Sequence, residues 1–165
     1  MKTYIGLYTM TESVSSLLLV IVYNLHNLNL SFAPPKKQGG IMKLSLIIPC
    51  YNEEESLPFI YAELVKVSAE LSDYEIEYLF INDGSKDHTL NKLKEMAASD
   101  ARVRYFSFSR NFGKEAAMYA GFCNAKGDYV AVMDADLQDP PSLLPQMLSI
   151  LQTGEYDSVA TRRVN

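Results

Sequence analysis

The chain has 165 residues, of which 48% are hydrophobic, and this size and composition suit one globular domain with a buried core. It carries 15 basic and 20 acidic residues, and the resulting net charge of −5 argues against a nucleic-acid partner, because phosphate backbones select basic surfaces. Cys50 and Cys123 stand far apart and outside any metal-binding spacing, so they are interpreted as free thiols in a reducing compartment.

The first 41 residues differ from the rest of the chain in charge and pattern. They contain three of the basic residues and one of the acidic residues, which leaves 12 basic and 19 acidic residues from Met42 onward. The apolar run Leu17 to Val22 is too short to cross a membrane, which takes about 20 residues. No signal-peptide cleavage site is evident. Residues 1–41 are therefore interpreted as an atypical leader, either non-native or disordered.

The residues just before Met42 suggest where translation begins. One coding of Gln38-Gly39-Gly40 contains a purine-rich bacterial ribosome-binding sequence. We therefore hypothesise that the native protein starts at Met42. Intact-mass analysis of protein made from its own gene tests this hypothesis, and a product that retains residues 1–41 would contradict it.

From Met42 onward, strand patterns and helix patterns alternate along the chain. Short apolar runs predict strands at residues 43–49, 76–81, 103–108, 129–134 and 157–161. Apolar residues at helical spacing predict helices at 57–71, about 90–97, 114–125 and 143–151, the third stopping at Gly127 and the fourth starting near Pro141. This alternation predicts an α/β Rossmann-like fold, with a mostly parallel sheet and helices on both faces.

Acidic residues follow three of the predicted strands. Glu53 comes after the first strand, Asp83 after the second, and Asp134 and Asp136 end the fourth. Because ligands of such sheets bind beyond the carboxyl ends of the strands, these carboxylates are expected to meet at one edge. Unpaired carboxylates in one cleft repel each other, and a bound cation relieves the repulsion.

The Asp134-x-Asp136 pair suits a hard cation. Mg²⁺ or Mn²⁺ takes oxygen ligands, and Mg²⁺ is usually held by one or two carboxylates together with substrate phosphates. The sequence contains neither a P-loop nor a G-x-G-x-x-G fingerprint. A diphosphate would therefore be held mainly through the cation, with Lys114 or Arg110 as helpers.

Five segments in order resemble family 2 glycosyltransferases of the GT-A fold: "SLIIPCYNEEESL", "FINDGSKDHT", "SRNFGKEAAMYAGF", "GDYVAVMDADLQDPP" and "SVATRR". The resemblance covers residues 43–165. It is closest to enzymes that transfer sugars to polyprenyl phosphates, of the bactoprenol glucosyltransferase-like and dolichol-phosphate mannosyltransferase-like types.

The resemblance implies a role for each matching residue. For the nucleotide sugar it implies Pro49, Tyr51, Glu53 and Asp83, the last accepting a hydrogen bond from the base. Lys114, the helper expected for the diphosphate, is grouped with them. For the catalytic centre it implies Asp134 and Asp136, which hold the metal and the diphosphate, with Gln138 beside the sugar or metal. For the acceptor phosphate it implies Arg162 and Arg163.

The implied activity is metal-assisted, inverting transfer of a sugar from a nucleotide-diphosphate sugar to polyprenyl phosphate. The product would serve synthesis of the cell envelope. The resemblance places this reaction in the cytoplasm, at the inner face of the plasma membrane, through membrane-associated segments absent from this chain. The resemblance is also compatible with a homo-oligomer. Because the chain ends at Asn165, directly after the two arginines, residues 42–165 are expected to form an incomplete domain that binds nucleotide but transfers poorly.

Simpler interpretations of the same residues stay open. Asp83-Gly84-Ser85 also fits a turn with a helix cap, and Asn52 with Glu55 fits a capping arrangement. "RNFGKEAA" fits a loop and helix start, Asp139-Pro140-Pro141 fits another helix start, and Arg162 with Arg163 fits solvated surface.

Three rival functions are compatible with a parallel sheet that has an acidic edge. A receiver-type signalling domain is disfavoured, because the first strand ends in Tyr51-Asn52-Glu53 and not in adjacent acids. A sugar nucleotidyltransferase is a closer rival, since it also binds a nucleotide and a metal. The third is a truncated nucleotide-binding fragment without transferase activity.

Overall fold

The computed structural model describes residues 5–10, 21–24, 40–138 and 140–163, with side chains for 40–138 and 140–161. Seven strands form one sheet: β1 (Ile5–Met10), β2 (Ile21–Asn24), β3 (Met42–Cys50), β4 (Tyr74–Asn82), β5 (Val103–Ser107), β6 (Tyr129–Val132) and β7 (Ser158–Arg163). The helices are α1 (Leu57–Glu70), α2 (Thr89–Ser99), α3 (Lys114–Asn124), the 3₁₀ turn η2 (Pro141–Leu143) and α4 (Leu144–Gln152).

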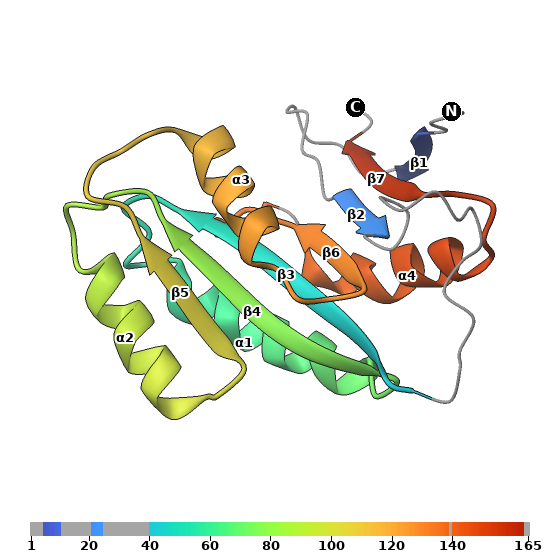
Figure 1. Cartoon of the computed structure of the whole chain (residues 1–165), viewed down its shortest axis with the longest axis horizontal. Coiled ribbons are helices and arrows are strands. Elements are labelled where there is room, and N and C mark those ends of the chain that lie inside the picture. The colour runs from blue at the N-terminus through green and yellow to red at the C-terminus, as the bar shows by residue number, and fades with distance from the viewer. Residues whose placement is uncertain (1–4, 11–20, 25–39, 139, 164–165) are drawn as a thin grey trace.

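The sheet has the strand order β1-β7-β2-β6-β3-β4-β5 (Figure 1). β3 pairs in parallel with β4 and β6, and β4 pairs in parallel with β5. β2 is antiparallel to both β6 and β7, so β7 runs in the same direction as β6. The α/β, mostly parallel architecture predicted from the sequence is confirmed, and the strands from β3 to β7 lie within a few residues of their predicted ranges.

Helices cover both faces of the sheet because the strand side chains alternate between the two faces. Leu46 and Ile48 of β3 point into the core cluster shared with α1, α2 and α4, whereas Ile47 points into the cluster under α3. All three side chains are at most 1% exposed. Burial on both faces explains why the sequence of β3 is a continuous apolar run and not an alternating pattern.

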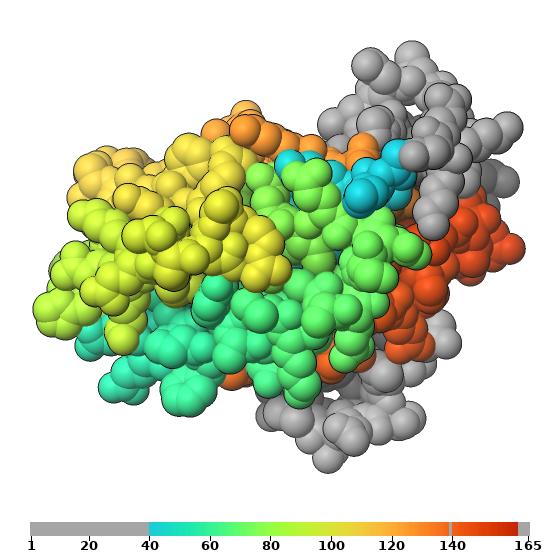
Figure 2. All heavy atoms as spheres, turned by 90° about the horizontal axis from the view of Figure 1, so that it is seen from below, coloured from blue at the N-terminus to red at the C-terminus, as the bar shows by residue number. Residues whose placement is uncertain are grey.

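Figure 2 shows the surface of α1 and α2 side by side, with the residues after 140 at the opposite end.

Two short strands, β1 and β2, come from the leader and were not predicted from the sequence. β2 lies between β6 and β7, and β1 pairs with the outer side of β7. Most of the leader, including Leu17 to Val20 and Gln38-Gly39, lies outside the described residues. Whether residues 1–41 are native therefore stays a prediction.

Gly127 does not stop α3, so that part of the sequence prediction is wrong. The helix ends at Asn124, and Ala125 is already extended. Gly127 is instead needed for close contact with β3. A Cβ at this position would lie 2.6 Å from the backbone nitrogen of Ser45 and 2.5 Å from the carbonyl oxygen of Tyr129.

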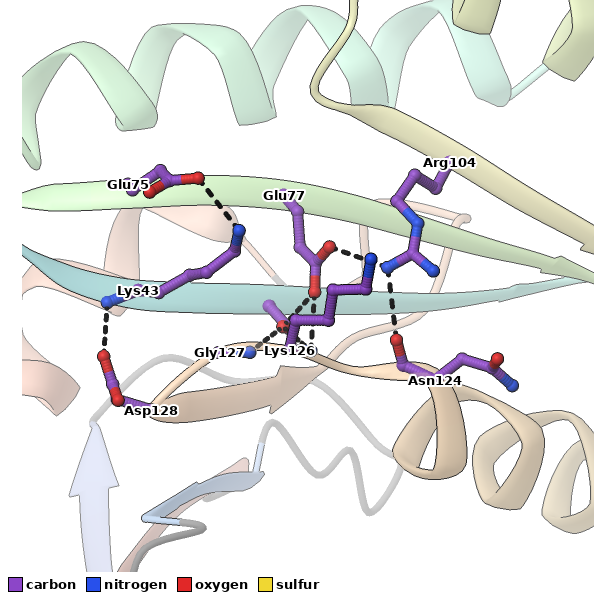
Figure 3. Close-up of polar contacts among 9 residues, drawn as sticks. Lys43, Glu75, Glu77, Arg104, Asn124, Lys126, Gly127 and Asp128 are labelled. Atoms are coloured by element: carbon purple, nitrogen blue, oxygen red, sulfur yellow. Dashed lines mark hydrogen bonds and ion pairs between the residues drawn. The ribbon is translucent and has the colours of Figure 1, made fainter.

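A buried polar network lies beside Gly127, away from the carboxyl ends of the strands (Figure 3). The Glu77 carboxylate accepts hydrogen bonds from the Ser45 hydroxyl (2.6 Å), the Lys126 backbone N–H (2.8 Å) and Arg104 Nη1 (2.8 Å). The backbone N–H of Gly127 in turn donates to Ser45 Oγ at 2.8 Å. These contacts fix the connection between α3 and β6 to β3 and β4.

Candidate active site

A pocket of about 290 Å³ lies at the carboxyl ends of β3, β4 and β6. Four carboxylates from three separate segments line it: those of Glu53, Asp83, Asp134 and Asp136. The other lining residues are Pro49, Cys50, Tyr51, Asn111, Gly113, Lys114, Ala117 and Ala135. The parallel sheet thus brings together side chains that are more than 80 residues apart in the sequence.

Hydrogen bonds join the two loops that follow β3 and β4. The backbone N–H of Asn52 donates to Ser85 Oγ at 2.9 Å, and that of Glu53 donates to Thr89 Oγ1 at 2.8 Å. Asn52 Oδ1 accepts the backbone N–H of Lys86 at 2.9 Å. The capping interpretation of Asn52 is therefore wrong, because its side chain joins the two loops. Helix α1 begins instead with Ser56 at the N-cap position.

Asp83 holds the loop that leads into α3. Its side chain is buried, with the residue only 3% exposed, and its two oxygens accept the backbone N–H groups of Phe112 (2.7 Å) and Gly113 (2.9 Å). Asp83 does not cap α2, which begins at Thr89 after His88. Each carboxylate oxygen has a second acceptor position, so these contacts are compatible with a further hydrogen bond from a ligand.

Gly84 lets the β4 loop pass directly against the loop before α3. It adopts φ +68°, and a Cβ there would lie 2.2 Å from the carbonyl carbon of Arg110 and 2.6 Å from the nitrogen of Asn111. A side chain at this position meets backbone that cannot move without displacing the Asp83 contacts.

We expect Gly84→Ala to destabilise the protein by about 2 kcal/mol or more, because a left-handed conformation costs 1–2 kcal/mol before the overlap is counted. Chemical unfolding measures the loss. Gly40→Ala is the matched control, since a Cβ at Gly40 meets nothing within 4 Å. Equal stability of the two variants would show that the loops are not packed this closely.

Lys114 and Asp134 form an ion pair across the pocket. Lys114 is the first residue of α3, and its Nζ lies 2.6 Å from Oδ1 and 2.7 Å from Oδ2 of Asp134. The side chains are 52% and 22% exposed, respectively. The ammonium group thus bridges α3 and the end of β6.

Asp136 is exposed, and the turn that follows Asp134 sets its position. Its Oδ1 accepts the backbone N–H of Gln138 at 3.0 Å, and Leu137 between them adopts φ +60°. Gln138 is itself exposed and is not among the residues that line the pocket. The structure therefore brings Asp136 to the pocket but does not bring Gln138.

The chemistry of this donor set fits a hard divalent cation. Asp134 and Asp136 line the pocket and supply carboxylate oxygens, the ligand type that Mg²⁺ and Mn²⁺ prefer. Among the described residues, no group of three or more His, Cys, Asp or Glu side chains could hold a metal ion. Water and substrate oxygens would supply the other ligands of an ion held by these two carboxylates.

Cys50 also lines the pocket, although it was interpreted from the sequence only as a free thiol. Its residue is 2% exposed, and burial, together with the charges of Glu53 and Asp134, raises the pKa of the thiol well above its usual value. A protonated, buried thiol is a poor nucleophile, so Cys50 contributes shape and not reactivity. Both cysteines are free, as predicted, although Cys123 is exposed and not packed.

Asn111 and Gly113 also line the pocket and were not singled out from the sequence. The only signal for them was their position in "RNFGKEAA", directly before a predicted helix. Arg110, proposed as a helper, lies instead over the ring of Phe112, 4.8 Å from its centre.

Arg162 and Arg163 belong to β7, paired with Thr9 and Met10 of β1, and their side chains lie outside the described part of the chain. Asp139, interpreted as part of a helix start, is likewise outside it, and the 3₁₀ turn begins at Pro141. None of the helices in the described segments is both long and apolar enough to span a bilayer.

Residues 45–165 match the family described as Glycosyl transferase family 2. Over 122 residues the chain is 46% identical to a prophage bactoprenol glucosyl transferase homolog of Escherichia coli (strain K12), covering 74% of this chain and 39% of that protein. It is 49% identical over 127 residues to the putative glycosyltransferase CsbB of Bacillus subtilis (strain 168), covering 77% and 37%. It is 42% identical over 126 residues to an undecaprenyl-phosphate 4-deoxy-4-formamido-L-arabinose transferase of Proteus mirabilis (strain HI4320), covering 76% and 38%. The chain thus spans less than half the length of these relatives.

Solved structures share the fold. A glucosyl-3-phosphoglycerate synthase from Mycobacterium tuberculosis in complex with UDP superposes with a TM-score of 0.52 at 25% identity, covering 69% of this chain and 41% of that one. A second structure of that enzyme, with Mn²⁺, UDP and phosphoglyceric acid, gives a TM-score of 0.50 at 27% identity, covering 69% and 40%.

Proposed function

The chain belongs to glycosyl transferase family 2, and from this premise we propose that residues 42–165 bind a nucleoside-diphosphate sugar for transfer to a polyprenyl phosphate. One observation carries the proposal. Carboxylates that follow three different strands line one pocket at the carboxyl edge of the sheet, together with Lys114. The names of the relatives that act on bactoprenol and undecaprenyl phosphate support the choice of acceptor.

The donor side of the pocket holds the metal and the nucleotide sugar. Asp134 and Asp136 hold Mg²⁺ or Mn²⁺, a choice supported by the Mn²⁺ complex of a structural neighbour. Such an ion, when bound, acts as a Lewis acid on the departing diphosphate. Tyr51 is 41% exposed at the pocket and offers its ring to the nucleoside, and Asp83 offers the free acceptor positions of a fixed carboxylate.

On the acceptor side, the phosphate group that attacks the sugar has to be positioned but needs little activation. A phosphate monoester has a second pKa of about 6, so it is already ionised at neutral pH and needs no general base. One of its oxygens forms a bond to the anomeric carbon while the bond from that carbon to the diphosphate breaks, which inverts the centre. We propose Arg162 and Arg163 as the residues that orient this phosphate. Their strand, β7, runs in the direction of β6 and so ends at the same edge.

A thermal-shift screen of nucleoside-diphosphate sugars with Mn²⁺ tests the donor part of the proposal. A ligand at about 100 times its Kd stabilises the folded state by about 2.7 kcal/mol, which raises the Tm of a protein of this size by several degrees. We expect this shift only when nucleotide sugar and Mn²⁺ are both present. Free sugars and Mn²⁺ with inorganic phosphate are the controls, and equal shifts from them would refute a donor site.

The rival sugar nucleotidyltransferase makes a different product. A nucleotidyltransferase releases pyrophosphate from a nucleoside triphosphate, whereas a glycosyltransferase releases a nucleoside diphosphate from its sugar donor. Incubation with either donor and chromatography of the nucleotides separates the two activities. Release of pyrophosphate would support the rival.

A further inference from the structure

The carboxylates of the candidate donor pocket differ in the kind of partner that they have. The Asp83 carboxylate is satisfied by two backbone N–H groups, and Asp136 accepts the N–H of Gln138. Asp134 has a full cation as its partner, since both of its oxygens lie within 2.7 Å of Lys114 Nζ. Lys114 is also the one cationic residue among the described residues that line this pocket.

This ion pair lies at the carboxylate to which we assign the metal. An ammonium group that contacts both oxygens of Asp134 occupies the space in which a metal ligand bond to that carboxylate would form. A divalent cation and the ammonium group cannot share Asp134 without strong repulsion, because two cations at contact distance destabilise each other. Binding of the metal therefore requires the Lys114 side chain to move away.

The fold lets the side chain move while its backbone stays in place. The backbone just before Lys114 is fixed, because the N–H groups of Phe112 and Gly113 are bound to the buried Asp83. The Lys114 side chain is 52% exposed, and its four-carbon stem rotates freely. Its ammonium can therefore swing from Asp134 to a nearby anion without any change in α3.

We propose that Lys114 is a displaceable counter-ion that couples binding of the metal to binding of the donor diphosphate. Without ligands, Lys114 neutralises Asp134 and weakens binding of the metal alone. When the metal takes Asp134, the released ammonium lacks a partner until a diphosphate supplies one. Metal and nucleotide therefore strengthen each other's binding, and by linkage the coupling is the same in both directions. This inference rests on the proposed donor and metal site.

The reactivity of the Lys114 amine measures whether Lys114 leaves Asp134, and this measurement needs no enzymatic turnover. An amine-acylating reagent followed by peptide mass spectrometry gives the labelling rate of each lysine. We expect slow labelling of Lys114 without ligand, labelling faster by about fivefold with saturating Mn²⁺, and slow labelling again with Mn²⁺ and UDP, because a partly exposed ion pair is worth up to about that factor. Lys94, exposed on α2, is the control within the same sample and should label at one rate throughout.

The Lys114→Gln variant gives two opposite changes in affinity. Calorimetry should show Mn²⁺ alone binding up to about fivefold tighter than in the wild type, since its competitor is gone. UDP in the presence of Mn²⁺ should bind about tenfold weaker, since a charged hydrogen bond to the diphosphate is lost. Lys94→Gln removes the same charge from α2 and should change neither affinity.

The outcomes separate this inference from the proposed function. Suppose that the wild-type protein binds Mn²⁺ and UDP together, but Mn²⁺ does not change the labelling rate of Lys114 and Lys114→Gln leaves the affinity for Mn²⁺ unchanged. The counter-ion inference is then wrong, and the donor site stands. If the wild type binds neither Mn²⁺ nor UDP, the proposed function fails and the inference fails with it.

Discussion

Replacing Asp134 with asparagine is expected to abolish Mn²⁺-dependent binding of nucleoside-diphosphate sugars. We expect an affinity loss of more than about 100-fold, because removing even the outer-shell partners of a bound metal costs 10–100-fold. The amide keeps the shape of the side chain but presents one neutral oxygen instead of two charged ones. Calorimetry with the nucleotide sugar found in the screen, with and without Mn²⁺, measures the loss.

The structure allows a failure of folding to be separated from a failure of binding. The Lys114–Asp134 pair is partly exposed, and pairs of this kind contribute 0–1 kcal/mol to stability, so Asp134→Asn should unfold close to the wild-type temperature. Glu95→Gln removes one negative charge from the exposed surface of α2 and is the matched control for net charge. Unchanged affinity in Asp134→Asn would remove Asp134 from the metal site.

The fold was largely predictable because its signals are local. Apolar runs and helical spacings lie within one segment, and β3 to α4 followed them closely. β1 and β2 were not predicted, because a four- to six-residue strand is stabilised by neighbours that are distant in sequence. β2 is antiparallel to strands more than 100 residues away, and nothing in its own residues specifies these partners.

The candidate site was predictable in its parts but not in its internal contacts. A parallel sheet carries whatever follows its strands to one edge, which is why Glu53, Asp83 and Asp134 could be grouped from the sequence. The partners of these carboxylates could not be foreseen. Asp83 is satisfied by backbone groups 29 and 30 residues away, and Asp134 by a lysine 20 residues away. No sequence motif specifies these long-range partners.

The Glu77 network illustrates the same limit, because no pattern around Glu77 distinguishes this acid from its neighbours in the sequence. Glu77 lies on β4, between β3 and β5, with its side chain 7% exposed, where an isolated charge would be costly. Removing one partner of a buried ion pair costs about 3–5 kcal/mol, because the other charge is left uncompensated. We therefore expect Glu77→Ala to lose stability of that order, because Arg104, Ser45 and the Lys126 N–H each lose the carboxylate as an acceptor.

Chemical unfolding at neutral pH measures this loss, and the same strand supplies the control. Glu75 lies two residues away on β4, and its side chain is 67% exposed in a pair with Lys43 at 2.9 Å. Glu75→Ala should cost no more than about 1 kcal/mol, as for other surface pairs. Similar losses in the two variants would mean that burial of the Glu77 network does not contribute to stability.

The pH dependence of stability gives a second, independent test of Glu77. Burial alone would raise the pKa of this carboxyl, but hydrogen bonds from Ser45, Lys126 and Arg104 outweigh it, so its pKa lies below the ordinary 4.5. A carboxyl whose pKa is lowered on folding stabilises the protein fully above its unfolded pKa, and this stabilisation disappears as the pH falls through the folded value. Glu77→Gln does not titrate. The difference in unfolding free energy between wild type and Glu77→Gln should therefore be constant near neutrality and shrink below about pH 4.5. Parallel curves down to low pH would show that Glu77 is not held as a carboxylate in the folded protein.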